Sequence, residues 1–205
     1  MNYDREQALE TVHARVRKCM LCPLHIGRTH AVPGDGPVNA TIMFIGEAPG
    51  FHEDQQGIPF VGAAGKLLNE LLDKAGIDRN TVYISNVIKC RPPANREPLP
   101  EEVAACGPFL DQQIEIINPK VIVTLGRYSM ARAFPEEKIS VVHGKPRKVG
   151  NYTYFPMYHP AAALHQPSLR GLVEADFNLL RELLEGNLVP EEFAPPPEAE
   201  QLSLF

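Results

Sequence analysis

The chain has 205 residues, 44% of them apolar, and a formal net charge of −5, which suffices for the core of one domain. No apolar run reaches the roughly 18 residues of a membrane-spanning helix, and the polar opening Met1-Asn-Tyr-Asp-Arg-Glu6 is unlike a signal peptide. We therefore expect a cytoplasmic monomer with no membrane partner. Because four acidic residues follow residue 186, the rest of the chain is nearly neutral and can carry a local basic face.

Helical and strand patterns alternate along the chain. Helical spacing and helix-end signals predict helices over residues 4–18, 63–75, 98–118, 126–134 and 169–184. Continuous apolar runs predict buried strands over residues 41–47, 82–88, 121–125 and 153–158. This order predicts an α/β fold with three α/β/α layers and a central four-stranded parallel sheet. Pro156 lacks a backbone donor, so we expect the last strand to be irregular or at an edge.

Polar residues stand where predicted strands end. Glu47 closes the first apolar run and His159 follows the last, and ligands of open parallel sheets bind beyond such ends, so both residues are expected to face one pocket. Asn86 lies inside the second apolar run, where a buried amide needs a dedicated partner such as a nucleobase edge. Phe60 is either a core aromatic or a wall of this pocket. An aromatic face, an amide and a histidine together suit a flipped pyrimidine.

The chain contains four cysteines, at positions 19, 22, 90 and 106. A cytoplasmic protein is not expected to use them as structural disulfides. Four thiolates can bind either Zn²⁺ or a [4Fe–4S] cluster, and the spacing alone does not distinguish the two. Alternatively, Cys90 and Cys106 are only buried apolar side chains. Either metal would join the first helix to the loop after the second strand, which indicates a structural role.

Taken together, these residues resemble family 4 uracil-DNA glycosylases, the thermostable iron–sulfur branch of the uracil-DNA glycosylase superfamily. The resemblance covers residues 1–186 and rests on Gly46-Glu-Ala-Pro-Gly50, Phe60 in Gly-Ile-Pro-Phe-Val-Gly, Asn86, His159-Pro-Ala-Ala and the cysteines Cys19, Cys22, Cys90 and Cys106. It implies a structural [4Fe–4S] cluster, with zinc as the alternative. It also implies excision of uracil from single- or double-stranded DNA, leaving an abasic site for base-excision repair.

The side chains then take definite roles. His159 is expected to donate to uracil O2, where negative charge develops as the glycosidic bond breaks. Asn86 is expected to pair with O4 and N3–H and thereby reject cytosine, and Phe60 to stack on the ring. The backbone that approaches the base most closely is expected to come from Gly46, Glu47 and Ala48.

One motif departs from the family 1 enzymes, which read Gly-Gln-Asp-Pro-Tyr where this chain reads Gly46-Glu-Ala-Pro-Gly50. Ala48 and Gly50 replace the aspartate that positions water and the tyrosine that blocks the thymine methyl, so neither role carries over. As a hypothesis, Glu47 occupies the space near uracil C5 and excludes thymine. The alternative is that Glu47 only holds its loop.

Basic residues near the strand ends are candidates for phosphate contacts, although such runs can equally be a solvated face. The candidates are Lys89, Arg91, Arg96, Lys145, Arg147 and Lys148. Leu164 is a candidate wedge that fills the space left by the flipped base, although its distance from His159 differs by one residue from the wedge leucine of family 1.

The composition changes after residue 186 to scattered proline and glutamate, which predicts a domain over residues 1–186 and a flexible tail over residues 187–205. The tail finishes with the apolar cluster Gln201-Leu-Ser-Leu-Phe205. This is either a ragged end or a docking peptide, since it resembles the pentapeptide that binds the bacterial sliding clamp. In the second case Gln201, Leu202, Leu204 and Phe205 would make the contacts.

Two other classes of protein share some of these features. A zinc or iron–sulfur DNA-binding module would keep the cysteines and basic residues, but it would not require Asn86 and His159 at strand ends. A nucleotide-binding hydrolase of similar layout would carry a phosphate-binding loop or a dinucleotide fingerprint, and the sequence contains neither motif.

Overall fold

The computed structural model describes residues 2–193, and its central sheet has the strand order β2-β1-β3-β5-β4-β6. Four neighbouring strands are parallel, namely β1 (Ile42–Gly46), β2 (Tyr83–Asn86), β3 (Val121–Leu125) and β5 (Tyr152–Met157). Each agrees with its predicted range to within two residues at either end. The predicted parallel sheet is therefore confirmed as the centre of the fold.

The sheet nevertheless has six strands rather than the predicted four. The additional strands are β4 (Arg147–Val149), antiparallel to β5, and β6 (Glu191–Glu192), parallel to β4. Both are short and polar, so neither produces an apolar run in the sequence. β6 also falls within the predicted tail, and Phe193 packs edge-to-face on Phe134 with ring centroids 4.9 Å apart. Residues 191–193 thus follow the sheet edge, while Gln201, Leu202, Leu204 and Phe205 lie outside the described residues.

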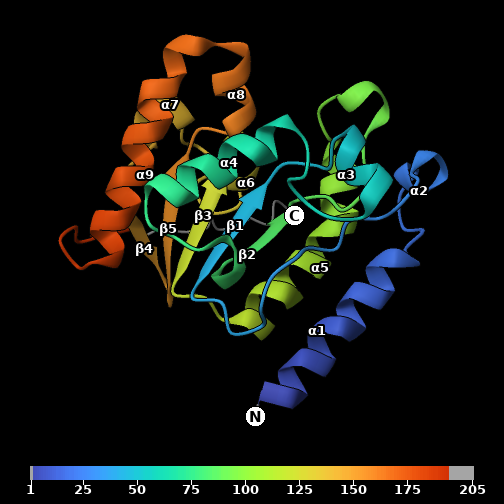
Figure 1. Cartoon of the computed structure of the whole chain (residues 1–205). Coiled ribbons are helices and arrows are strands. Elements are labelled where there is room, and N and C mark those ends of the chain that lie inside the picture. The colour runs from blue at the N-terminus through green and yellow to red at the C-terminus, as the bar shows by residue number, and fades with distance from the viewer. Residues whose placement is uncertain (1, 194–205) are drawn as a thin grey trace, which may run out of the picture.

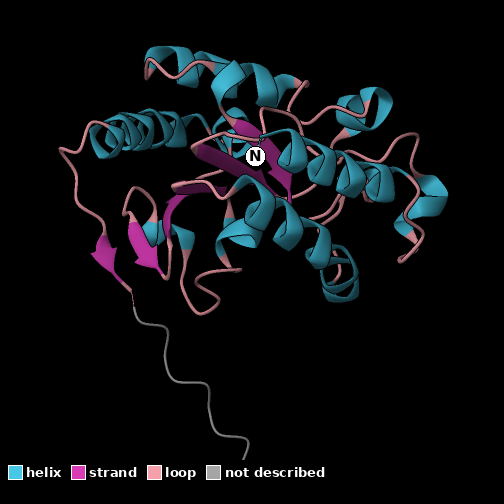
Figure 2. Ribbon diagram, turned by 90° about the horizontal axis from the view of Figure 1, so that it is seen from below, coloured by secondary structure: helices cyan, strands magenta, loops and turns pink. Residues whose placement is uncertain are grey.

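Helices cover both faces of the sheet, as Figures 1 and 2 show. One face is covered by α4 (Ala63–Lys74), α8 (Pro160–His165) and α9 (Arg170–Leu184), and the other by α1 (Asn2–Arg17) and α5 (Pro100–Ile117). Successive side chains of β1 alternate between the two cores: Phe44 packs toward α4 and α9, whereas Met43 and Ile45 pack toward α1 and α5. The predicted three-layer architecture is confirmed.

The connections contain shorter elements that the sequence patterns did not predict as helices of their own. They are α2 (Leu24–Gly27), α3 (Phe51–Gln56), α6 (Arg127–Met130), α7 (Ile139–Val142) and the 3₁₀ turns η1 (Arg79–Thr81), η2 (Pro93–Asn95) and η3 (Pro167–Leu169). Only α6 falls inside a predicted helix, and it is shorter than predicted. Within residues 2–193, no helix combines the length and the apolarity needed to cross a bilayer.

Pro156 occupies a position in β5 that tolerates its missing donor. It pairs with Thr124 of β3, but its carbonyl accepts from the Gly144 N–H, at 2.9 Å, on the opposite side of the strand. The paired part of β4 ends opposite Tyr154. The donor that proline lacks therefore faces away from β3, beyond the point where β4 stops pairing. The strand as a whole is not at an edge as predicted, because β5 lies between β3 and β4.

Candidate active site

A cleft of about 390 Å³ opens at the carboxyl ends of β1, β2 and β5. Its size is typical of small-molecule sites. Five of the predicted uracil-binding residues line it together, namely Glu47, Ala48, Phe60, Asn86 and His159. Segments that are far apart in sequence thus meet at one edge of the sheet, as the strand-end argument predicted.

Gly46, the last residue of β1, lies between the Asn86 amide and the Phe60 ring. A Cβ atom at this position would overlap Asn86 Oδ1 and come within 2.8 Å of Phe60 Cζ, so a larger residue does not fit. The Asn86 side chain is 1% exposed, and its Oδ1 has no hydrogen-bond partner within the described part of the chain. Because an unpaired buried acceptor costs roughly 1–3 kcal/mol, this oxygen points to a ligand that donates an N–H.

Phe60 is held in an uncommon backbone conformation, with φ of 55°. The Glu53 carboxylate fixes the loop around it by accepting from the backbone N–H groups of Gly50, Val61 and Gly62 at 3.1, 2.9 and 2.8 Å. On the other side Gly65 of α4 lies against the Phe60 backbone, and a Cβ atom there would overlap the Phe60 carbonyl. The Glu53 carboxylate and the close approach of Gly65 therefore fix the backbone that carries the Phe60 ring.

His159 is the N-cap of α8, where its Nδ1 accepts from the Ala161 N–H at 3.1 Å. A neutral ring that accepts through Nδ1 carries its proton on Nε2. The ring stacks against Phe60, with centroids 5.5 Å apart and an interplanar angle of 27°. Burial lowers the pKa of His159 to about 4, with Glu53 acting in the opposite direction. At neutral pH His159 is therefore an uncharged N–H donor at the cleft.

Glu47 is half-buried at the wall of the cleft, and burial raises its pKa above the ordinary value. The nearby Glu97 carboxylate raises the pKa further, whereas Arg127 lowers it. Arg127 and the Tyr128 hydroxyl both donate to Glu97, the latter at 2.8 Å. Glu47 therefore faces a rim with charges of both signs, one of which opposes its ionisation.

Comparison with known proteins agrees with this geometry. Residues 33–185 match the family model described as the uracil DNA glycosylase superfamily. The chain belongs to this superfamily. It is 50% identical over 186 residues to the type-4 uracil-DNA glycosylase of Sulfurisphaera tokodaii (86% of this chain, 84% of that protein). The corresponding identity to the type-4 enzyme of Thermotoga maritima is 48% over 188 residues (89% and 98%).

A more distant relative helps to place the chain within the uracil DNA glycosylase superfamily. The type-5 uracil-DNA glycosylase of Thermus thermophilus is 32% identical over 159 residues, covering 62% of this chain and 70% of that protein. Identity to the type-4 proteins is higher and extends over more of the chain. The resemblance inferred from the motifs is thereby confirmed.

The four cysteines line a second, small cavity between the end of α1, α2, the segment after β2 and α5. All are free thiols. Cys90 and Cys106 are buried and each accepts a hydrogen bond at 3.2 Å, from Arg28 Nη1 and from the Lys89 backbone N–H respectively. Burial raises the pKa of both thiols, that of Cys106 to about 11. Among the described residues, no three potential ligands are arranged to hold a single metal ion.

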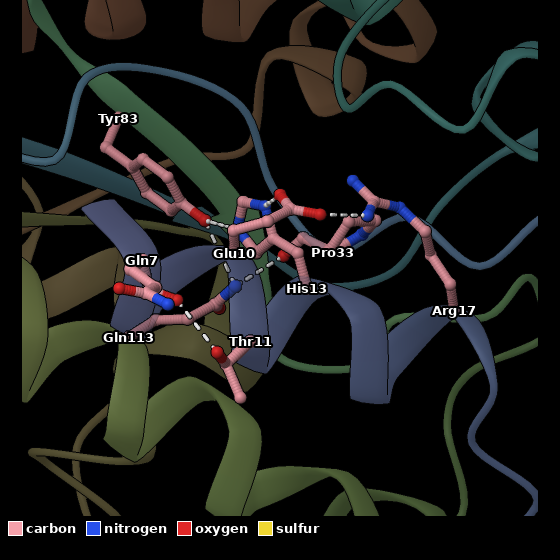
Figure 3. A network of polar contacts seen from close by, with 8 residues as sticks. All are labelled: Gln7, Glu10, Thr11, His13, Arg17, Pro33, Tyr83 and Gln113. Carbon is pink, nitrogen blue, oxygen red and sulfur yellow. Dashed lines mark hydrogen bonds and ion pairs between the residues drawn. The ribbon is translucent and has the colours of Figure 1, made fainter. Parts of the chain in front are cut away.

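The predicted phosphate contact at Lys89 is wrong. Its side chain is 1% exposed, and its Nζ donates to Ser85 Oγ, the Asn86 carbonyl and Gln113 Oε1 at 2.5, 2.8 and 2.7 Å. Gln113 also donates to the Tyr83 hydroxyl at 3.0 Å, within the polar network shown in Figure 3. Lys89 therefore fixes the end of β2 from inside the protein and does not reach DNA.

Three other basic candidates are engaged in ion pairs. Arg147 pairs with Glu137 at 2.9 Å and lies over the rings of Phe134 and Phe193, so it anchors the β4 and β6 edge. Lys148 pairs with Glu192 of the same edge at 3.0 Å. Arg96 lines the cleft, but its guanidinium holds the buried Glu102 carboxylate through bonds of 2.9 and 2.6 Å.

The remaining candidates for DNA contacts are accessible to solvent. Lys145 is exposed and follows Gly144, whose bond to Pro156 places it at the carboxyl edge of the sheet. Arg91 is half-buried immediately before the cleft-lining Pro92. Leu164 is 44% exposed on α8, next to the cleft-lining His165.

Sequence reasoning missed two residues that shape the cleft, Glu53 and Gly65. Glu53 could have been found from its position three residues after Gly50, because a glutamate at N3 of a helix can accept from the backbone N–H of the N-cap residue. Gly65 produced no such signal, since a glycine inside a helical pattern indicates only a locally less stable helix. Its contact with Phe60 depends on how two segments meet in space.

We expect the His159 ring to stay neutral, with its proton on Nε2, throughout pH 5–8. Because its folded pKa of about 4 lies below the ordinary 6.5, the unfolded chain binds the proton more readily between these values. The neutral His159 ring therefore contributes to the free energy of unfolding above pH 6.5, and this contribution is lost as the pH falls toward 4. Imidazole ¹⁵N NMR shifts measure both the charge and the tautomer.

The matched control for this expectation is Ala161→Pro, which removes the one N–H that Nδ1 accepts while keeping a first-turn residue that helices tolerate. This variant should lose the preference for the Nε2–H form. A wild-type ring that titrates near pH 6.5, or that carries its proton on Nδ1, would contradict the assignment.

Proposed function

We propose that this chain is a type-4 uracil-DNA glycosylase, which hydrolyses the N-glycosidic bond of uracil in DNA and leaves an abasic site, the first step of base-excision repair. The observation that carries this proposal is the unpartnered Asn86 Oδ1, buried in the same cleft as the neutral His159. The type-4 relatives, at 50% and 48% identity, support the same activity.

Asn86 reads the base in this proposal. Uracil N3–H donates to the orphaned Oδ1, and the Asn86 amide N–H donates to uracil O4. Cytosine presents an acceptor at N3 and a donor at N4, so both bonds would be replaced by repulsive contacts. A bidentate contact of this kind discriminates by about 1–3 kcal/mol. Phe60 stacks on the ring and adds affinity with little choice of base.

His159 lowers the barrier to bond breaking. As the C1′–N1 bond breaks, its electron pair moves onto uracil, mainly to O2, and the sugar becomes positively charged. The Nε2–H of His159 is already oriented, so it stabilises charge that exists only in the transition state. Water then adds to C1′ and loses a proton to solvent, and the uracil anion takes up a proton. The imidazole remains neutral throughout, in accord with its low pKa.

Glu47 is proposed to fill the space beside uracil C5, where a thymine methyl would otherwise fit. Its half-buried position at the cleft wall supports this role. Gly46 and Ala48 flank it and let the backbone approach the base closely. A strongly dissociative reaction needs little help from a base to capture water, so Ala48 in place of an aspartate is compatible with hydrolysis.

We infer that Cys19, Cys22, Cys90 and Cys106 hold a structural [4Fe–4S] cluster. Four thiols in one cavity, N–H donors aimed at two sulfurs, and the nearby Arg28 and Lys89 suit a cluster that is anionic with its four thiolates. Zinc would require the four sulfurs to converge on one point at about 2.3 Å. When bound, the cluster supplies a cross-link between α1, the end of β2 and α5.

We also propose contacts with DNA and with a partner protein outside the cleft. Arg91 and Lys145 are proposed to bind phosphates of single- or double-stranded DNA, and Leu164 to enter the space left by the flipped uracil. The protein is proposed to act as a monomer. The sequence beyond Phe193 supports a docking peptide for the bacterial sliding clamp at its end.

An oligonucleotide cleavage assay tests the proposed function. The protein, with its iron content measured, is incubated with strands that contain a single uracil, cytosine or thymine, and abasic sites are then cleaved with alkali. We expect cleavage of the uracil strand alone. Asn86→Ala should lower kcat/KM for uracil by about 5- to 150-fold, because the bidentate contact is lost, with thermal melting as the control for folding. Iron-loaded wild-type protein that releases no uracil would overturn the proposal.

A further inference from the structure

An exposed aromatic side chain belongs to a residue that is next in sequence to the cleft wall. Phe51 is the first residue of α3, and 52% of its surface is exposed. It directly follows Gly50, which lines the cleft, and consecutive Cα atoms are about 3.8 Å apart. The Phe51 backbone is therefore adjacent to the wall of the cleft, and its exposed ring belongs to the surface that surrounds the base-binding site.

A cation from a second loop covers this ring. The Arg91 guanidinium lies over Phe51 at 5.2 Å from the ring centroid, and its Nε donates to Asn95 Oδ1 at 2.7 Å. Pro92 and Asn95 of the same loop line the cleft. The loops that follow β1 and β2, both of which contribute residues to the cleft wall, thus meet through an aromatic ring and a guanidinium.

Both groups are held in fixed positions. His52 packs edge-on against the Phe51 ring, with centroids 5.4 Å apart and an interplanar angle of 79°. Asn95, the partner of Arg91, has a left-handed backbone with φ of 53°, as does Ala94, and such a turn needs support from its surroundings. The bond from Arg91 to Asn95 supplies that support and orients the guanidinium.

We propose that Phe51 and Arg91 form a stacking subsite for the nucleotide next to the flipped uracil, on the same strand. This proposal rests on the proposed function. Flipping a base removes a stacking partner from its neighbours, and an exposed aromatic ring beside the pocket replaces that partner whatever the neighbouring base is. The Arg91 charge then lies close to the adjoining phosphate, where it adds salt-dependent affinity. The subsite selects for an unstacked strand rather than for a sequence.

The test removes the neighbouring base and the aromatic ring in turn. Wild-type protein and Phe51→Ala act on a single-stranded uracil oligonucleotide and on two versions with an abasic spacer immediately 5′ or 3′ of the uracil. On the intact strand, Phe51→Ala should raise KM by about 5- to 150-fold, the range for loss of one base–aromatic stack. With one of the two spacers the difference between the proteins should disappear, and that spacer identifies the side on which the base stacks.

Matched variants separate stacking from folding and charge. Phe51→Tyr should behave as wild type, and Val189→Ala, which shortens another highly exposed apolar side chain, should change nothing. Arg91→Met should reduce the slope of log affinity against log salt by about one. A Phe51→Ala defect that persists with both spacers, or wild-type KM on the intact strand, would overturn the proposal. Failure of the proposed function is distinct, because wild-type protein would then release no uracil from any strand.

Discussion

His159→Ala is expected to slow uracil release about 10²- to 10³-fold, the usual effect of removing one preorganised donor to a developing oxyanion. The Nε2–H meets charge that appears on O2 only as the glycosidic bond breaks, so the loss should fall on kcat and leave KM nearly unchanged. Single-turnover kinetics with excess protein over a uracil-containing strand measures the chemical step directly.

His159→Asn is the control that separates chemistry from folding. Asparagine is a good N-cap residue, so its side-chain oxygen should keep the bond to the Ala161 N–H, whereas alanine loses a cap worth about 1 kcal/mol. The asparagine amide is shorter than imidazole and does not reach the same point. We expect His159→Asn to melt like wild type and still lose the rate. A wild-type rate in this variant would remove His159 from the mechanism.

Cys106→Ser is expected to abolish binding of the proposed cluster and to leave the protein poorly folded. Cys106 is buried on α5 and faces the cavity that it shares with the other cysteines. For comparison, structural Zn²⁺ binds zinc-finger peptides with on the order of 10–16 kcal/mol, which is as large as the roughly 5–15 kcal/mol that keeps a whole domain folded. Iron and sulfide content, absorbance near 400 nm and thermal melting measured by circular dichroism report the outcome.

Ala105→Ser is the neighbouring control, since residue 105 lines the same cavity and the variant keeps all four thiols. It should retain iron, the absorbance near 400 nm and most of the melting temperature. Wild-type protein that contains zinc in place of iron would favour the alternative metal. Cys106→Ser with full iron content and normal melting would show that this cysteine is not a ligand.

The centre of the fold could be predicted because burial leaves a direct trace in sequence. Strands buried on both faces, such as β1 with Met43 and Phe44 at 0% exposure, read as continuous apolar runs. Polar residues at the ends of such runs meet at one edge of a parallel sheet. This is why the sequence assigns Glu47, Asn86 and His159 to one pocket.

The features that the sequence did not predict depend on contacts between segments that are distant along the chain. In the sequence, Lys89 looks like an exposed basic residue at a strand end, and only the positions of Ser85 and Gln113 make it a buried amine bonded inside the protein. Phe60 adopts its left-handed backbone because Glu53 and Gly65 enclose its loop, which no local propensity describes. The edge strands β4 and β6 are too short and polar to form a pattern.

The edge strand β6 has a consequence for how the enzyme can be recruited. It ends at the margin of the sheet farthest from β2, four inter-strand spacings from β1, or about 19 Å at ~4.8 Å each. A molecule tethered through the residues beyond Phe193 would therefore be joined to the enzyme at this margin of the sheet, and not at β1, whose end opens into the cleft.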